Sequence, residues 1–164
     1  EKKLYLKRKK SLNITQKHFE KTKSLTSIEI KEFSILCLIL KNLKFFNKNQ
    51  ELLKDIKLFT QENMLIFEKI KNSLGKQEIL NFEDLNLYPE IIEKIFESSS
   101  IKYILNKGEL GESKMIEIFN EIRRDIKNYE LEMRIEELES KFSNDFNENT
   151  FNELKELKKL QKIN

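Results

Sequence analysis

Hydrophobic side chains between Ser113 and Phe142 keep helical spacing without a break, but they occupy two different faces. One face carries positions three or four residues apart: Met115, Phe119, Ile122, Ile126, Tyr129 and Met133. The other face carries a second such set: Leu131, Ile135, Leu138 and Phe142. From Tyr129 to Leu131 a helix turns by about 200°, at roughly 100° per residue. This pattern predicts one long helix whose two halves pack against different partners.

A shorter amphipathic segment closes the chain after a polar break at 143–149. Thr150 and Glu153 have the spacing of a capping box, which predicts the start of a helix there. We expect this helix to fold back along the long one as a two-helix hairpin. The predicted seam between the two helices has seven members: Leu131, Ile135, Leu138, Phe142, Leu154, Leu157 and Leu160.

Side chains near the turn or off that seam are the candidate contacts for a partner. A few large side chains usually carry most of the binding energy of an interface, and charges at its rim set orientation and association rate. The candidates combine large apolar residues with basic ones: Met133, Arg134, Phe146, Phe151, Lys155 and Lys158.

The pattern before the long helix predicts a helical bundle. Thr26 and Glu29 have capping-box spacing in front of segment 27–43, which is apolar on most faces and is therefore expected to be central. Residues 60–75 predict a second helix that ends at Gly75. Its predicted inward side chains are Met64, Leu65, Phe67, Ile70 and Leu74.

Two further signals mark helix starts. Pro89 fits the first turn of a helix, where its missing N–H would have no partner in any case. Ser113 is placed to cap the long helix. The three Gly and single Pro of the chain also favour helices with short connections. The predicted fold class is therefore all-α: a bundle of about six helices, with a long shared helix that leads into a C-terminal two-helix hairpin.

Charge separates the first residues from the rest. Residues 1–23 carry nine basic and two acidic residues, a net charge of +7, whereas the whole chain is +3 and the remainder is −4. The chain lacks Ala, Val and Trp, which we attribute to an AT-rich genome, so its many lysines are weak evidence for nucleic-acid binding. The basic segment favours a flexible linker over a weak nucleic-acid contact. We expect three parts: a linker at 1–25, a bundle at 26–128 and a hairpin at 129–164.

Motifs that carry chemistry are missing from the sequence. It contains no Gly-rich phosphate loop, no nucleophile elbow and no pair of cysteines, and the single histidine, His18, lies in the basic segment. Cys37 sits inside the apolar run 35–40, which is far short of the ~20 residues that a membrane span needs. We expect this chain to catalyse no reaction, to hold no cofactor or metal ion, to act in the cytoplasm, and to be a monomeric fragment, since it begins at Glu1 rather than Met.

Three stretches resemble the C-terminal, helicase-binding region of bacterial DnaG-type replicative primases, most closely the alphaproteobacterial form. The first is EIKEFSILCLILKNLKFF, an acidic residue and an aliphatic run before a turn at Asn42; the His and Pro that usually follow are absent. The second is IKLFTQENMLIFEKIKNSL, a Thr cap with a helix. The third is the closing pattern FNEIRRDIKNYELEMRIEELESKFSNDFNENTFNELKELKKLQKIN.

This resemblance implies a bundle and a hairpin that share one long helix. In the family, the hairpin binds the N-terminal collar of the hexameric replicative helicase and so recruits primase during primer synthesis in DNA replication. Zinc and magnesium belong to upstream domains of the parent primase. Two alternatives stay open at this point. One is the N-terminal domain of the replicative helicase, and the other is a non-enzymatic structural or scaffold protein of an AT-rich bacterium.

Overall fold

The computed structural model describes residues 25–75, 89–106, 110–144 and 147–163, and the predicted linker at 1–25 falls almost wholly outside them. The described residues form an all-α protein, as the sequence predicts. Its elements are α2 (Ser27–Lys41), α3 (Leu43–Lys48), η1 (Gln50–Leu53), α4 (Gln61–Gly75), α5 (Pro89–Ser98), α6 (Lys102–Leu105), α7 (Glu112–Asn144) and α8 (Glu148–Ile163).

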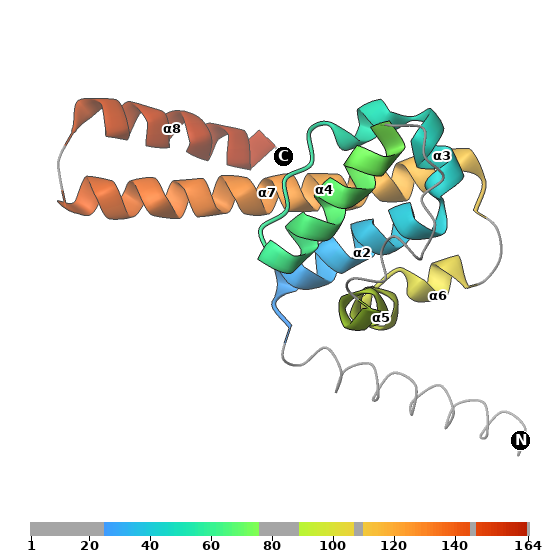
Figure 1. Cartoon of the computed structure of the whole chain (residues 1–164). Coiled ribbons are helices and arrows are strands. Elements are labelled where there is room, and N and C mark those ends of the chain that lie inside the picture. Colours follow the sequence, from blue (N-terminus) through green and yellow to red (C-terminus); the bar gives the residue numbers. More distant parts are fainter. Residues whose placement is uncertain (1–24, 76–88, 107–109, 145–146, 164) are drawn as a thin grey trace, which may run out of the picture.

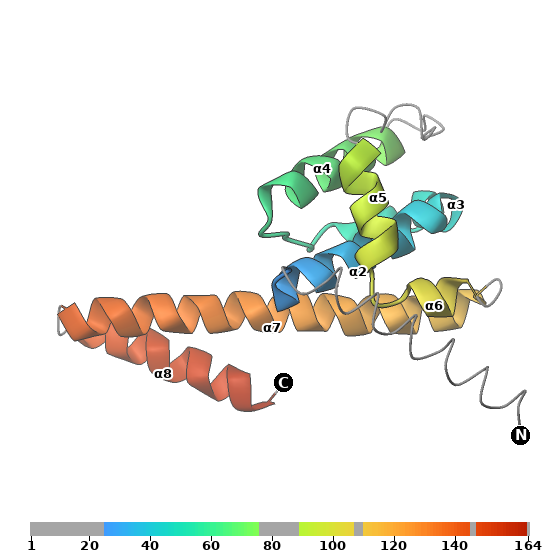
Figure 2. The same ribbon diagram turned by 90° about the horizontal axis from the view of Figure 1, so that it is seen from below.

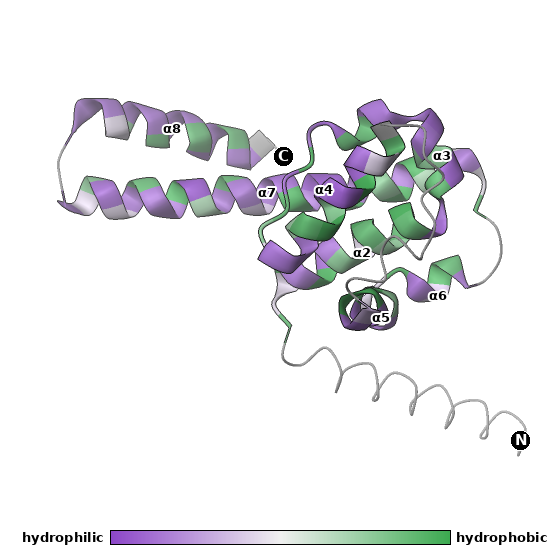
Figure 3. Ribbon diagram, viewed as in Figure 1, coloured by the Kyte–Doolittle hydropathy of each residue, from purple (hydrophilic) through white to green (hydrophobic). Residues whose placement is uncertain are grey.

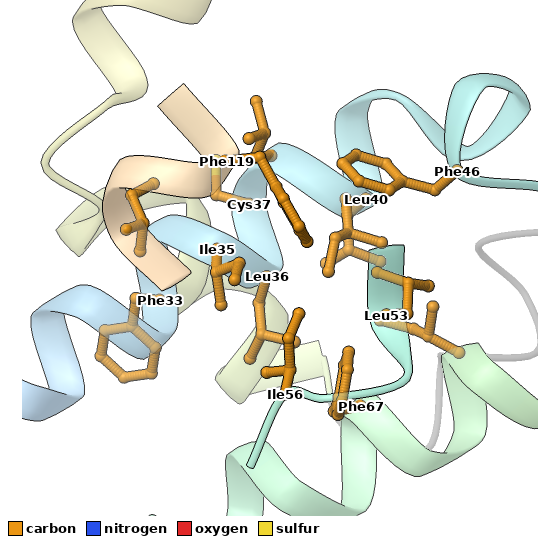
Figure 4. Close-up of a cluster of buried hydrophobic side chains, with 14 of the residues drawn as sticks. Phe33, Ile35, Leu36, Cys37, Leu40, Phe46, Leu53, Ile56, Phe67 and Phe119 are labelled. Atoms are coloured by element: carbon orange, nitrogen blue, oxygen red, sulfur yellow. The ribbon is translucent and has the colours of Figure 1, made fainter. Parts of the chain in front are cut away.

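Helix α2 is the centre of the bundle. Every residue from Glu32 to Leu40 is buried, and α4, α5 and the first half of α7 surround the helix (Figures 1 and 2). The hydropathy colouring shows the same arrangement, with α2 largely apolar and the outer helices mixed (Figure 3). Figure 4 shows Phe46, Phe67 and Phe119 converging on α2 from three other elements. The single cysteine, Cys37, is fully buried here, and burial raises the pKa of its thiol.

Polar contacts fix the ends of two bundle helices. Thr26 and Glu29 form the predicted capping box at the start of α2, with the Thr26 N–H donating to Glu29 Oε2 at 2.7 Å. The buried carboxylate of Glu32 accepts hydrogen bonds from the backbone N–H groups of Phe59 and Thr60. It also accepts one from Asn63 Nδ2 at 2.8 Å. Glu32 therefore ties the start of α4, and the loop before it, to α2.

Helix α7 belongs to both parts of the molecule. Its 33 residues span about 50 Å, at roughly 1.5 Å per residue. The first half lies along α2, while the second half leaves the bundle and pairs with α8 (Figure 1). Tyr129, which the sequence places first in the hairpin, packs against the bundle core and meets the Phe59 ring edge-on at 5.1 Å. Two residues later, Leu131 packs in the hairpin instead.

Two side chains of α4 do not point inward as predicted. Met64 is 40% exposed and Leu65 is 49% exposed, whereas Phe67, Ile70 and Leu74 are buried. The inner face of α4 begins with Asn63, which is fully buried because it bonds Glu32. Met64 and Leu65 lie about 100° and 200° round the helix from Asn63 and so fall off that face.

Two predicted helix caps are also wrong. Helix α7 begins at Glu112, because the Gly111 carbonyl already accepts the first helical bond from Met115 N–H, so Ser113 lies inside the first turn. Helix α8 begins at Glu148, and Thr150 lies within it. Asn147 takes the capping role, since its side chain accepts from Asn149 N–H and its carbonyl accepts from Phe151 N–H. By contrast, Pro89 is the first residue of α5, as predicted.

Among the helices that the structure describes, none combines the length and the apolar character needed to cross a membrane.

Candidate functional site

The hairpin holds a small apolar cluster of its own, separate from the bundle core. Ile135 and Leu138 of α7 and Leu154 of α8 are buried, and two half-buried side chains, Leu131 and Leu157, pack against them. These are five of the seven predicted seam residues. The ring of Phe142, a sixth, is half-buried and lies 5.7 Å from the ring of Phe151 near the turn. The hairpin is therefore a thin two-helix layer with few buried side chains.

Ion pairs join the two hairpin helices on both sides of this seam. Arg134 of α7 donates through Nε and Nη2 to Glu153 Oε1 of α8, at 3.2 and 2.8 Å, and through Nη1 to Glu137 at 3.0 Å. The hydrogen bonds to Glu153 and then to Glu137 raise the pKa of Arg134. On the other side, Lys158 pairs with Glu139. Two of the basic residues predicted as partner contacts thus hold the hairpin itself together.

The seam opens towards the bundle end of α8. Leu154 is buried, Leu157 is half-buried and Leu160, the seventh predicted member, is 52% exposed. Figure 2 shows the cause, because α8 runs away from α7 as it returns towards the bundle. Contrary to the prediction, Leu160 takes no part in the buried cluster.

A groove of about 810 Å³ lies at this opening, and we call it the corner groove. Its apolar lining comes from the loop before α4, from α7 and from α8: Phe59, Leu131, Met133 and Leu160. Its charged lining comes from the same loop and α7: Lys57, Lys127, Glu130, Arg134 and Glu137. The groove is therefore a corner where the bundle and both hairpin helices meet.

The structure distributes the predicted partner contacts over two sides of the hairpin. Met133 is 46% exposed and lines the corner groove together with Arg134. Phe151, 48% exposed, lines a separate hollow along α8 with Lys155 and Lys158. Phe146 lies outside the described residues. The six candidates thus do not form one continuous surface.

Sequence reasoning missed the contribution of the bundle to this site. Lys57 and Phe59 lie in an irregular loop, yet they form one wall of the corner groove, and Lys57 pairs with Glu130 of α7 at 3.0 Å. The only sequence signal is an aromatic residue, Phe59, two positions before the start of α4. Helical periodicity does not extend into a loop, so it could not place this residue opposite the hairpin.

Within the described ranges, no three His, Cys, Asp or Glu side chains gather where they could hold a metal ion. Comparison of the chain with models of protein families, with curated proteins and with solved structures finds no match.

Proposed function

We propose that this chain is the helicase-docking region of a bacterial DnaG-type primase, and that its hairpin presents the primase to the collar of the hexameric replicative helicase in the cytoplasm. The chain supplies no catalysis in this role. It supplies a contact, and the polymerising chemistry resides in other domains of the parent protein.

One observation carries this proposal. A single helix, α7, is shared between a bundle with a full apolar core and a projecting hairpin in which only three of the described side chains are buried. A projecting element with so little core adds little to the stability of the bundle, which favours a role in contact with another molecule. The same arrangement is what the primase resemblance implies for this region.

The first test is complex formation with the replicative helicase of the same organism, measured by size exclusion with light scattering. The full chain is compared with a chain that ends at Glu130, which keeps Tyr129 on the bundle core but removes the hairpin. We expect the full chain to bind the helicase hexamer and the shortened chain not to bind. Circular dichroism on both chains shows whether the bundle stays folded.

No complex at tens of micromolar with the full chain would contradict the proposal and would favour a scaffold protein. Equal binding by the folded, shortened chain would keep the helicase as partner but would move the contact from the hairpin to the bundle.

A further inference from the structure

The hairpin seam is left incomplete at the corner groove. Counting from the ring contact between Phe142 and Phe151, Leu131 lies about three turns back along α7 and Leu160 about two and a half turns on along α8. The two leucines therefore stand at nearly the same level of the antiparallel pair. Closed packing would bury one against the other, yet Leu160 is more than half exposed. The apolar surface that the seam would have covered lines the groove instead.

The rim of the corner groove is basic once its internal ion pairs are counted. Glu130 pairs with Lys57 at 3.0 Å, and Glu137 pairs with Arg134 at 3.0 Å and with Lys141 at 2.6 Å. Both carboxylates of the rim are thus already neutralised from within the chain. Lys127 makes no ion pair with any described residue. A partner with a carboxylate at this position would gain a charge pair, whereas a partner with a basic residue there would meet a like charge.

We propose that the corner groove binds an amphipathic, acidic helix of the partner, which lies between the diverging α7 and α8 and completes their seam as a third helix. Its apolar residues contact Leu131, Met133, Leu160 and Phe59, and a carboxylate beside this apolar stripe pairs with Lys127. This inference rests on the proposed function, because the helicase collar is the molecule that supplies the helix.

The shape of the groove favours a helix as the occupant. Two of its walls are themselves helices that separate progressively, and amphipathic helices bind such grooves through apolar residues spaced three, four and seven apart. A volume of about 810 Å³ accommodates a few large side chains from one helix face.

The exposed apolar pair on α4 provides a matched control for the apolar wall. Met64 and Leu65 have the same side-chain types as Met133 and Leu160 and nearly the same exposure, but they do not line the groove. The full chain is titrated with the helicase hexamer, using Met133→Ala and Leu160→Ala as test variants. Each is expected to raise Kd roughly tenfold, and Met64→Ala and Leu65→Ala less than about twofold. Thermal melting followed by circular dichroism checks that all four variants remain folded.

The charge of the groove is tested separately. Lys127→Glu reverses the free charge at the rim, and Lys44→Glu makes the same change on α3, which lies at the end of the bundle away from the hairpin (Figure 1). We expect Lys127→Glu to weaken helicase binding and to reduce its dependence on salt, while Lys44→Glu leaves both close to those of the unmodified chain.

The outcomes separate the groove from the proposed function. If the unmodified chain binds the helicase and neither Met133→Ala nor Leu160→Ala weakens the complex, the groove is not the site, although helicase docking stands. If the unmodified chain does not bind the helicase at all, both the proposed helicase docking and the proposed role of the groove are contradicted. If the chain alone forms a dimer that Met133→Ala and Leu160→Ala abolish, the occupant is a second copy, and the proposal of a partner helix is overturned.

Discussion

The bundle and the hairpin share one helix but are stabilised in different ways. In the part of the bundle that the structure describes, 24 buried apolar residues form one cluster round α2, which is buried on nearly every side. In the hairpin, three buried residues and a set of exposed ion pairs join α7 to α8. Exposed ion pairs contribute little to stability, because water screens them, so the hairpin depends on the anchoring of α7 in the bundle. An element of this kind can open locally without global unfolding.

The largest expected effect comes from Phe119, which lies on the bundle half of α7. Its ring is fully buried and packs 5.2 Å from the ring of Phe46. Phe119→Ala is expected to lower the free energy of unfolding by about 4 kcal/mol and to destabilise both parts together, because the hairpin loses its anchor. Thermal denaturation followed by circular dichroism measures this change. A loss below about 1 kcal/mol would contradict the view that α7 is held by the bundle core.

The next largest loss of stability is expected at Glu32. Its carboxylate positions the loop with Phe59, which forms the bundle wall of the corner groove. Glu32→Met leaves three donors unpaired, on Phe59, Thr60 and Asn63, and is expected to cost about 3 kcal/mol. Glu32→Gln is the matched control. The Oδ1 atom of Asn63 has no hydrogen-bond partner among the described residues, so a turn of its amide lets it accept from the new side-chain amide. Denaturant unfolding of both variants measures the difference, and equal losses would contradict this account.

Leu138 tests whether the hairpin opens by itself. This residue is buried in the hairpin cluster, and Leu138→Ala is expected to cost about 2 kcal/mol at the lower end of the range for leucine. The loss should be local, so amide hydrogen exchange should speed up in α8 and the second half of α7 but not in α2. Uniform acceleration over both parts would mean that they unfold as one unit, which would contradict a separate opening of the hairpin.

Acidification is expected to have the smallest effect. Hydrogen bonds from Lys141, and then from Arg134, hold the pKa of Glu137 below the ordinary glutamate value of 4.5, and a hydrogen bond from Lys159 does the same for the pKa of Glu156. A lowered folded-state pKa means that the stabilisation is present above about pH 4.5 and is lost as the pH falls through the lowered value. Amide exchange measured at decreasing pH, and corrected for intrinsic rates, should show α8 weakening before the buried part of α2, from Glu32 to Leu40. The start of α2 is not used as the reference, because hydrogen bonds from Thr26 lower the pKa of Glu29 as well. Glu137→Gln and Glu156→Gln should each reduce that pH dependence.

The sequence predicts both apolar faces of α7, because both belong to one helical stretch without Gly or Pro, from Ser113 to Phe142. Spacing predicts Met115, Phe119, Ile122 and Ile126 on one face and Ile135 and Leu138 on the other, and all six are buried. Leu131 is half-buried, and Ile118 is buried although the predicted stripe does not include it. The prediction that Leu160 is buried in the hairpin seam is wrong for a physical reason. Periodicity states which residues share a face, but it does not state how far apart two helices lie along their length. The divergence of α8 from α7 therefore could not be predicted.

Long-range polar contacts are the second limit. Asn63 begins the buried face of α4, yet a polar residue at that position gives no hydrophobic signal, so the sequence predicts a buried face through Met64 and Leu65 instead. Its burial depends on Glu32, which lies 31 residues earlier and is itself fully buried. Nothing local in either residue reveals the other. The same contact positions the loop with Phe59, so the bundle wall of the candidate site was missed with it.

Because α7 is continuous, it connects the hairpin to the bundle as a rigid arm and not as a flexible linker. Its free half, from Glu130 to Asn144, is about 22 Å long at roughly 1.5 Å per residue, and no Gly or Pro provides a hinge where it leaves the bundle. A rotation of the bundle by about 10° therefore moves the far end of α7 by about 4 Å. Any load on the hairpin is carried back to the bundle as torque, so whatever holds the hairpin also determines the direction in which the bundle faces.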